Sequence, residues 1–344
     1  MSTFTERTSR WRAAPGWVLR VLIGLVAVVV ALATMGAGYE AIASTQDSQQ
    51  HPAPGQLFDV GGHRLHISCS GQGTPTVVLE AGGGGASLDW SLVQPAVAQK
   101  TQVCAYDRAG AGWSDAGPLP RTPQRVADDL HTLLQQANLP GPYVLVTHSD
   151  AGIPTELFMV QHPDEVAGVV LVDTRQPDSL SADDRQHQLD QARMLPTITT
   201  IVGRFGIGRL FGADLYPQIH PEGRFLPSAT RTEMLLQSAS PGYVDQVIST
   251  IESATANDVE LQALTPGALG SKPLVVLTSE QYLALYSGWR TAQQELSALS
   301  RDSVHVTVVS GEHYLQWQHP QLVIDAISQV VDAVRSGVPL RSSM

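Results

Sequence analysis

Tyr143-Val-Leu-Val-Thr-His-Ser-Asp-Ala-Gly-Ile153 is the most informative stretch of this chain. Its apolar first half predicts a buried strand, and the residues after Ser149 can continue as a helix. A sharp strand-to-helix turn with small neighbours would expose the hydroxyl of Ser149 as a nucleophile. The common form of this turn has glycine at both outer positions, whereas here they are Thr147 and Ala151. The stretch therefore predicts a nucleophilic serine, provided that other parts of the chain supply its partners.

Short apolar runs recur on both sides of this stretch and alternate with segments of helical periodicity. Strands are expected at 56–60, 63–69, 75–80, 102–106, 143–147, 166–172, 273–278 and 305–309, and helices at 92–100, 123–137, 153–162, 289–300 and 320–335. The first two strands form a hairpin signal around Gly61-Gly62. Strands that alternate with helices form a parallel sheet covered on both faces, and uniformly apolar strands fit that burial. The prediction is an α/β fold with a mostly parallel sheet and flanking helices.

The alternation of strands and helices stops between residues 175 and 266. Helical patches remain at 183–195 and 244–254, and about 90 residues is too long for a plain loop in a compact domain. We expect an inserted helical cap at the carboxyl ends of the strands, where open α/β sheets bind ligands. The globular part would then comprise a first core segment at 56–174, the cap at 175–266, a second core segment at 267–336 and a tail at 337–344.

The N-terminal region differs in character from the rest. Residues 1–20 are basic, and the uncharged apolar run at 21–38 is long enough to span the hydrocarbon core of a bilayer. Basic residues before the run predict a membrane anchor with the globular domain outside the cytoplasm. The alternative is a secreted protein whose signal at 21–43 is cleaved near Ala41-Ile-Ala43, but the apolar region of a signal is usually shorter. A polar linker is expected at 44–55.

Composition excludes some classes of partner and leaves others open. A net charge of −11 argues against a nucleic-acid partner, which would require a basic face. No metal or cofactor is expected, because the chain has no His-x-x-Glu-His, no cysteine cluster and no dinucleotide or P-loop fingerprint. The only two cysteines, Cys69 and Cys104, form an even pair. Outside the cytoplasm such a pair favours a disulfide, although two small buried side chains would look the same in sequence. The oligomeric state is left open.

Four motifs follow one another in a recognisable order. They are Val77-Val-Leu-Glu-Ala-Gly-Gly-Gly-Gly85, Tyr106-Asp-Arg-Ala-Gly-Ala-Gly-Trp-Ser-Asp115, His148-Ser149 with Gly152, and Ser310-Gly-Glu-His-Tyr-Leu-Gln. They resemble the oxyanion loop, the Asp-x-Arg-Gly-x-Gly-x-Ser element, the nucleophile turn and the histidine loop of the α/β-hydrolase superfamily. The resemblance covers roughly 56–336 apart from the cap, and points to its serine-esterase or prolyl-aminopeptidase-like branch. It also implies that the second and fourth strands are neighbours, which would bring Cys69 and Cys104 together.

The resemblance implies a role for individual residues. Ser149 would be the nucleophile and His313 the general base. The acid would be Asp173, directly after the strand at 166–172, with Glu280 as the alternative after the strand at 273–278. At that second position the chain has Gln and Tyr where aspartate is usual.

Two backbone N–H groups, of Gly83 and Asp150, would form the oxyanion hole, and Asp107 and Arg108 would brace the loop behind it. Asp150 departs from the resemblance, since its position is usually apolar, aromatic, Gln or Met. A carboxylate beside a forming oxyanion is electrostatically unfavourable. Either it points away, or it selects a cationic or hydroxylated substrate.

The function expected from these features is cleavage of a small-molecule carboxylic ester, or a related acyl compound, through an acyl-enzyme. A prolyl-aminopeptidase-like peptidase is one alternative, because it shares the Asp-x-Arg element. The other is a ligand-binding protein that kept the fold but turns over little, which the departures at Thr147, Asp150 and Ala151 motivate.

Overall fold

A computed structural model describes residues 16–50, 53–238, 241–256 and 264–340. Residues 1–15 of the expected basic segment, 51–52 of the expected linker, 239–240 and 257–263 of the expected cap and 341–344 of the tail lie outside the described residues.

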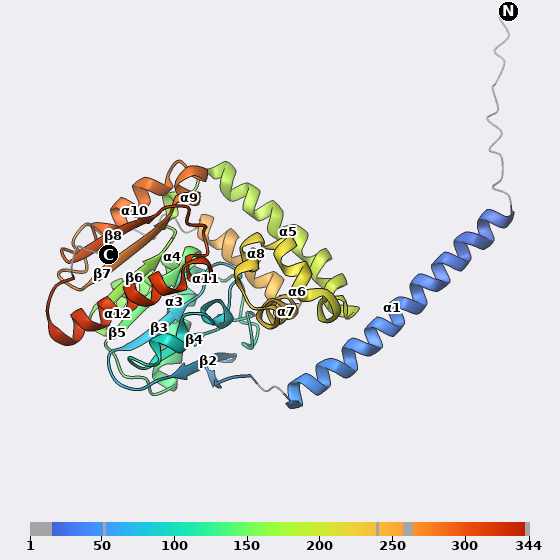
Figure 1. Ribbon diagram of the computed structural model, residues 1–344, viewed down its shortest axis with the longest axis horizontal. Coiled ribbons are helices and arrows are strands. Elements are labelled where there is room, and N and C mark those ends of the chain that lie inside the picture. The colour runs from blue at the N-terminus through green and yellow to red at the C-terminus, as the bar shows by residue number, and fades with distance from the viewer. Residues whose placement is uncertain (1–15, 51–52, 239–240, 257–263, 341–344) are drawn as a thin grey trace, which may run out of the picture.

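The core of the molecule is an eight-stranded sheet with the order β1-β2-β4-β3-β5-β6-β7-β8 (Figure 1). Its strands are β1 (Gln56–Asp59), β2 (Arg64–Ser70), β3 (Thr76–Glu80), β4 (Val103–Tyr106), β5 (Tyr143–His148), β6 (Val166–Val172), β7 (Leu274–Ser279) and β8 (Ser303–Val308). β2 is antiparallel to both of its neighbours, and all other pairs are parallel. The predicted α/β class and mostly parallel sheet are confirmed.

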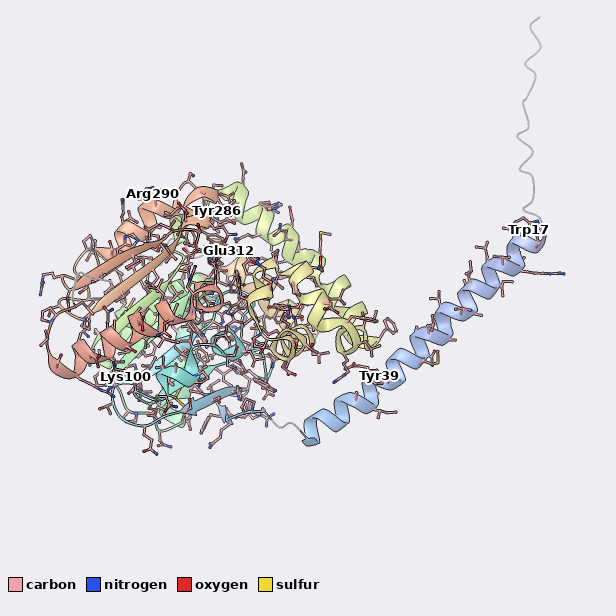
Figure 2. All side chains as sticks on the ribbon, viewed as in Figure 1. Trp17, Tyr39, Lys100, Tyr286, Arg290 and Glu312 are labelled. Atoms are coloured by element: carbon pink, nitrogen blue, oxygen red, sulfur yellow. A yellow bond between two sulfur atoms is a disulfide. The ribbon has the colours of Figure 1, made fainter. Side chains whose placement is uncertain are left out.

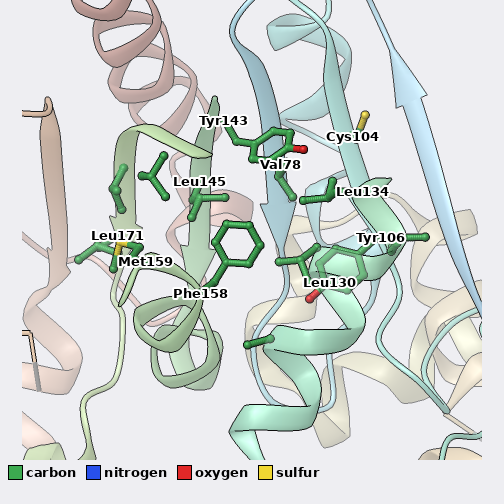
Figure 3. Close-up of a cluster of buried hydrophobic side chains, with 14 of the residues drawn as sticks. Val78, Cys104, Tyr106, Leu130, Leu134, Tyr143, Leu145, Phe158, Met159 and Leu171 are labelled. Carbon is green, nitrogen blue, oxygen red and sulfur yellow. The ribbon is translucent and has the colours of Figure 1, made fainter. Parts of the chain in front are cut away.

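Helices cover both faces of the sheet because successive side chains of a buried strand point to opposite sides. On one face, Leu145 of β5 packs in a cluster with Leu134 of α3 (Pro123–Gln136) and Phe158 of α4 (Gly152–Gln161) (Figure 3). α10 (Trp289–Ser297) covers the same face. On the other face, Val144 and Val146 pack with α2 (Gln94–Val97) and α12 (Pro320–Ser336). The helix expected at 92–100 is limited to α2 and is flanked by turns.

Among the described residues, four α-helices lie between β6 and β7. They are α5 (Ala182–Arg204), α6 (Ile207–Ile219), α7 (Ser228–Gln237) and α8 (Pro241–Ala256), and they lie together at one end of the sheet (Figure 1). A small apolar cluster that includes Tyr216, Leu226 and Met234 joins α6 and α7 to Trp317 of α11 (Leu315–Gln318). The helices occupy the segment expected to form a cap, whose boundaries at 175 and 266 stay a prediction.

The N-terminal helix α1 (Gly16–Gln50) extends away from the sheet (Figure 1). Its part from Gly16 to Ala43 contains an 18-residue stretch with a mean hydropathy of 2.6, none of which is buried, so this part is long and apolar enough to cross a membrane. The linker expected at 44–55 is wrong in its first part, because α1 continues to Gln50. No Gly or Pro stands between Gly38 and Pro52, so nothing in this part of the sequence stops the helix.

A disulfide joins two neighbouring strands. Cys69 of β2 and Cys104 of β4 are opposite each other in the antiparallel ladder, and their sulfur atoms are 2.07 Å apart. The bond lies near the end of β4, which leads into the Asp107–Asp115 loop.

Candidate active site

The turn after β5 presents Ser149 in an unusual backbone conformation. Its φ is +53°, in the left-handed region that non-glycine residues rarely adopt. A Cβ on Gly152, which opens α4, would collide with the side chain of Thr174, and one on Gly82 would lie 2.9 Å from the Cβ of Ser149. The positions around this turn that have no room for a side chain are therefore those of Gly82 and Gly152. This explains how Thr147 and Ala151 are tolerated at the positions where glycine is common.

Three side chains that are far apart in the sequence meet at this turn. The hydroxyl of Ser149 lies 2.8 Å from Nε2 of His313, and Nδ1 of the same imidazole lies 2.7 Å from Oδ2 of Asp173. His313 comes from the loop between β8 and α11, and Asp173 directly follows β6. His313 is 4% exposed and Asp173 is fully buried. The structure thus brings together the three residues expected as nucleophile, base and acid.

The carboxylate of Asp173 is held from several sides. Its Oδ1 accepts hydrogen bonds from the backbone N–H of Ser279 and from Nε1 of Trp289, each at 2.9 Å. Its Oδ2 accepts from the hydroxyl of Ser279 at 2.5 Å as well as facing His313. These donors fix the orientation of the carboxylate, and through it that of the imidazole.

The alternative acid, Glu280, has a different partner. It opens α9 (Glu280–Leu285), and its Oε2 accepts a hydrogen bond from the backbone N–H of Ser310 at 2.7 Å. This contact supports the start of the loop that carries His313. The structure therefore pairs Asp173, and not Glu280, with the imidazole.

The segment after β7 contributes residues that sequence reasoning missed. Besides Ser279, Gln281 accepts a hydrogen bond from the backbone N–H of His313 at 2.7 Å. The ring of Tyr282 stacks on the imidazole, with centroids 3.7 Å apart and planes 4° from parallel. A signal was present in the sequence: Ser279-Glu-Gln-Tyr282 stands where an acid is usual but offers donors, acceptors and an aromatic ring instead. These residues hold the histidine in place.

His148, next to the serine, is a packing residue. It is fully buried, and its Nε2 lies 3.1 Å from the carbonyl oxygen of His313, to which it can donate. Burial, with a further contribution from the charge of His313, lowers the pKa of His148 well below its usual value. A neutral His148 fits this buried position, where it supports the loop that carries His313.

The glycine loop after β3 is braced as expected. The guanidinium of Arg108 donates to the carbonyl oxygen of Gly82. The carboxylate of Asp107 accepts hydrogen bonds from the backbone N–H groups of Ser87 at 2.6 Å and Trp113 at 3.0 Å, and it lies 2.8 Å from Nδ1 of His66. Asp107 therefore ties the end of β4 to β2 and to the segment that follows the glycines.

Asp150 is paired with a cation that the sequence did not reveal as its partner. Oδ1 of Asp150 accepts a hydrogen bond from Arg175 at 2.8 Å, and the two side chains are 19% and 3% exposed. Burial by itself raises the pKa of Asp150, but the charges of Arg175, Arg108 and His313 outweigh it, so the pKa is lowered. A Cβ on Gly83 would collide with the other carboxylate oxygen, so the pair lies against the glycine loop. Arg175 thus offsets the negative charge that made Asp150 unfavourable at this position.

This pairing predicts a non-additive response to mutation. Removing Arg175 alone, in Arg175→Met, is expected to lower the rate of hydrolysis because an uncompensated carboxylate then lies beside the glycine loop. Adding Asp150→Asn removes that charge and should restore much of the rate, with a coupling of about 1–3 kcal/mol, typical of residues in contact. Hydrolysis rates and urea unfolding of the wild type, both single variants and the double variant measure this coupling. Purely additive effects would contradict it.

Two of the pockets near the turn at Ser149 lie beneath the cap. One is lined by Gly83 to Ala86, Asp89, Tyr314 and the cap residues Tyr216 and Tyr243. Burial raises the pKa of Asp89 to about 7, opposed by a hydrogen bond from the backbone of Ala86 and by the charge of Arg108. The other pocket is lined by the Asp150–Arg175 pair, Ile153 and residues of α8. The cap therefore forms one wall of both pockets.

A cluster of potential metal ligands lies outside this site. His131, His162 and Glu165 bring one ligand atom each within 4.8 Å of the others. The two imidazoles are stacked, however, with centroids 3.7 Å apart and planes 12° from parallel. In-plane lone pairs of stacked rings run side by side and do not converge on one ion. We therefore assign no metal to this cluster.

Comparison with known proteins agrees with this architecture. A family model described as "alpha/beta hydrolase fold" matches residues 75–199. Over 302 residues the chain is 28% identical to "Probable transporter efuK" of Hormonema carpetanum, covering 80% of this chain and 42% of that protein. It is 25% identical to an uncharacterized protein of Schizosaccharomyces pombe, covering 81% of this chain and 56% of that protein. The chain thus spans about half the length of these relatives. An "AB hydrolase superfamily protein" of Gibberella zeae is 21% identical, with coverages of 76% and 87%.

Solved structures with the same arrangement include enzymes of several activities. The Cif epoxide hydrolase of Acinetobacter nosocomialis has a TM-score of 0.67 at 13% identity, over 86% of this chain and 96% of that one. The enol-lactonase of Burkholderia xenovorans has a TM-score of 0.61 at 18% identity, with coverages of 80% and 100%. A thermophilic esterase of Thermogutta terrifontis has a TM-score of 0.58 at 22% identity, with coverages of 79% and 94%. At these identities the likeness shows the fold alone, and a fold of this kind hosts many activities. The sheet order, the turn at Ser149 and these comparisons together show that the chain has the alpha/beta hydrolase fold.

Proposed function

We propose that the chain is a serine hydrolase that cleaves a carboxylic ester, or a related acyl compound, through an acyl-enzyme. The observation that carries the proposal is the continuous hydrogen-bonded path from Ser149 through His313 to Asp173. Nucleophile, base and orienting acid are each within hydrogen-bond distance of the next, which is the geometry that such chemistry requires.

The proposed reaction begins when Oγ of Ser149 attacks the ester carbonyl carbon and Nε2 of His313 takes the hydroxyl proton. The carbonyl oxygen becomes an oxyanion that accepts hydrogen bonds from the N–H groups of Gly83 and Asp150. The tetrahedral intermediate collapses, His313 returns the proton to the leaving alcohol, and an acyl-serine remains. Water then attacks this acyl-serine with His313 as base, and the carboxylic acid and free Ser149 are released. Asp173 stabilises the imidazolium in both halves.

The identity of the nucleophile favours ester cleavage among the activities of the structural neighbours. Epoxide hydrolases of this fold attack with an aspartate, whereas this chain has Ser149 at the turn. The esterase and the lactonase among the neighbours act on acyl carbon, which suits a serine. The tyrosines and Asp89 beside the glycine loop make the pocket partly polar.

We also propose that the protein is tethered to a membrane by α1 with the hydrolase domain outside the cytoplasm. The apolar helix and the basic residues that precede it in the sequence support this orientation. The disulfide between Cys69 and Cys104 supports it independently, because such bonds persist in oxidising compartments.

A fluorophosphonate probe tests the proposed chemistry directly. We expect the purified protein to gain the mass of one phosphonyl group, and peptide mapping to place the adduct on Ser149. Prior incubation with an ester substrate should slow the labelling. A chain that stays unmodified after prolonged exposure would be a ligand-binding protein with this fold and would overturn the proposal. A panel of p-nitrophenyl esters of increasing acyl length, compared with aminoacyl amides, then separates an esterase from an aminopeptidase.

A further inference from the structure

The apolar part of α1 contacts one corner of the cap near its own end, at Gly36, Tyr39 and Glu40. A Cβ on Gly36 would collide with the carbonyl oxygen of Phe205, and the ring of Tyr39 lies against Gly206. The carboxylate of Glu40 accepts a hydrogen bond from Arg209 at 2.8 Å, and the two side chains are only 20% and 14% exposed. Phe205 and Gly206 connect α5 to α6, and Arg209 lies in the first turn of α6. The α5–α6 corner is thus packed against the end of the apolar helix (Figure 1).

Aromatic residues mark both ends of the apolar part of α1. Trp17 lies near its start and Tyr39 near its end, with exposed fractions of 67% and 46% (Figure 2). They are separated by about 33 Å of helix at 1.5 Å per residue, close to the roughly 30 Å thickness of a hydrocarbon core. Trp and Tyr are enriched at both interfaces of a membrane because their rings have an apolar body and a polar edge. This spacing assigns Tyr39, and the Glu40–Arg209 ion pair beside it, to the outer interface.

Two large apolar side chains follow directly after that ion pair. Leu210 and Phe211 of α6 are 64% and 54% exposed, while Gly208 and Gly212 of the same helix are buried. Both exposed residues directly follow Arg209, which is bonded to Glu40 next to Tyr39. Scattered apolar side chains on a soluble surface need no explanation, but a pair next to the end of a membrane-spanning helix would face lipid.

We infer that the α5–α6 corner of the cap docks on the outer leaflet of the bilayer, with Leu210 and Phe211 inserted at the boundary between headgroups and acyl chains. The inference rests on the proposed membrane anchoring by α1 and does not depend on ester cleavage. In this arrangement the cap lies between the bilayer and the pockets beside the glycine loop, because α6 and α8 line those pockets.

Depth-dependent fluorescence quenching tests the inference in the full-length protein. Both native cysteines are in the disulfide, so an environment-sensitive thiol dye labels a single introduced cysteine in the absence of reductant. Three sites are compared in two sets of phosphatidylcholine vesicles, whose acyl chains carry bromine either near the headgroup or near the middle of the bilayer. Phe211→Cys reports on the cap corner and Leu25→Cys on the anchor. Val338→Cys is the water-facing control, because Val338 is exposed and follows the end of α12, a helix that lies on the side of the molecule away from α1 (Figure 1).

We expect the dye at position 211 to emit at shorter wavelength than the dye at 338, and to lose at least half of its intensity to shallow bromines. The dye at 25, about 12 Å along the helix from Trp17, should be quenched by the deep bromines, and the dye at 338 by neither set. If 211 behaves like 338 while 25 is quenched, the anchor holds and the docking is refuted. If 25 is unquenched as well, the anchor itself fails. A dye at 211 that is shielded from both bromine and aqueous iodide would indicate a protein partner, such as a second copy, and would also overturn the inference.

The ion pair between Glu40 and Arg209 allows a charge-reversal test of the same docking. Glu40→Arg places two cations together and should reduce the bromine quenching at position 211 severalfold without changing it at position 25. Combining it with Arg209→Glu restores opposite charges and should restore the quenching. Loss of quenching that the reversed pair does not rescue would show that this contact does not hold the cap on the membrane.

Discussion

Replacing Ser149 with alanine is expected to lower kcat for ester cleavage by about 10⁵- to 10⁶-fold, with KM changed only a few-fold. The attacking atom is lost, whereas the pocket and the glycine loop that bind the substrate remain. Steady-state rates with a p-nitrophenyl ester measure the effect, and the fluorophosphonate adduct should disappear in parallel. Ser297→Ala, in the last turn of α10, is the control and should react like the wild type. Retention of more than a few per cent of the rate would remove Ser149 from the proposed mechanism.

A second substitution at the same position separates chemistry from folding. Alanine at φ +53° carries a conformational cost of roughly 1–2 kcal/mol, which serine also bears but glycine does not. Ser149→Gly should therefore be as inactive as Ser149→Ala while matching or exceeding the thermal stability of the wild type. Inactivity that accompanied unfolding in both variants would leave the loss of rate without a chemical interpretation.

Replacing Asp173 with asparagine is expected to lower kcat by about 10⁴-fold. The amide retains an acceptor for Ser279 and Trp289, but its NH₂ group facing Nδ1 of His313 would favour the tautomer with the proton on Nε2. That tautomer cannot accept the proton of Ser149. Asparagine also tolerates the φ of +44° at this position better than most residues, so the fold should survive, and unfolding curves check this.

Glu280→Gln is the matched control for the acid. Glu280 accepts a hydrogen bond from the N–H of Ser310, and the amide oxygen of glutamine can do the same. The rate should therefore fall by less than about tenfold. The opposite pattern, with an active Asp173→Asn and an inactive Glu280→Gln, would reassign the acid to Glu280.

Much of the fold was predictable from local patterns. All eight strands were expected within a few residues of their observed positions, because parallel strands covered on both faces are short apolar runs between turn residues. The interruption between β6 and β7 was equally visible, since no strand interrupts the helical patches there. The prediction was wrong where the sequence pattern distinguishes helix from loop poorly. At 44–50 a polar composition suggested a linker, but no residue there stops the helix, and α1 continues to Gln50.

The candidate site was predictable in part. Motif order singled out Ser149 and His313, and their expected partners lie beside them in the structure. The sequence favoured Asp173 as the acid but left Glu280 open, because both follow strands that end at the same edge of the sheet. That choice depends on which carboxylate the loop after β8 can reach.

The features that were predictable from the sequence depend on residues close together along the chain, whereas the others depend on contacts between distant residues. Periodicity, glycine spacing and motif order are local, so the chain alone indicated an α/β sheet, a serine turn and an apolar N-terminal helix. The pairing of Asp150 with Arg175 and the stacking of Tyr282 on His313 join side chains that only folding brings together. The contact between Glu40 and Arg209 spans the anchor and the cap in the same way. Such pairs depend on directions and distances in space, which hydrophobic patterning does not encode.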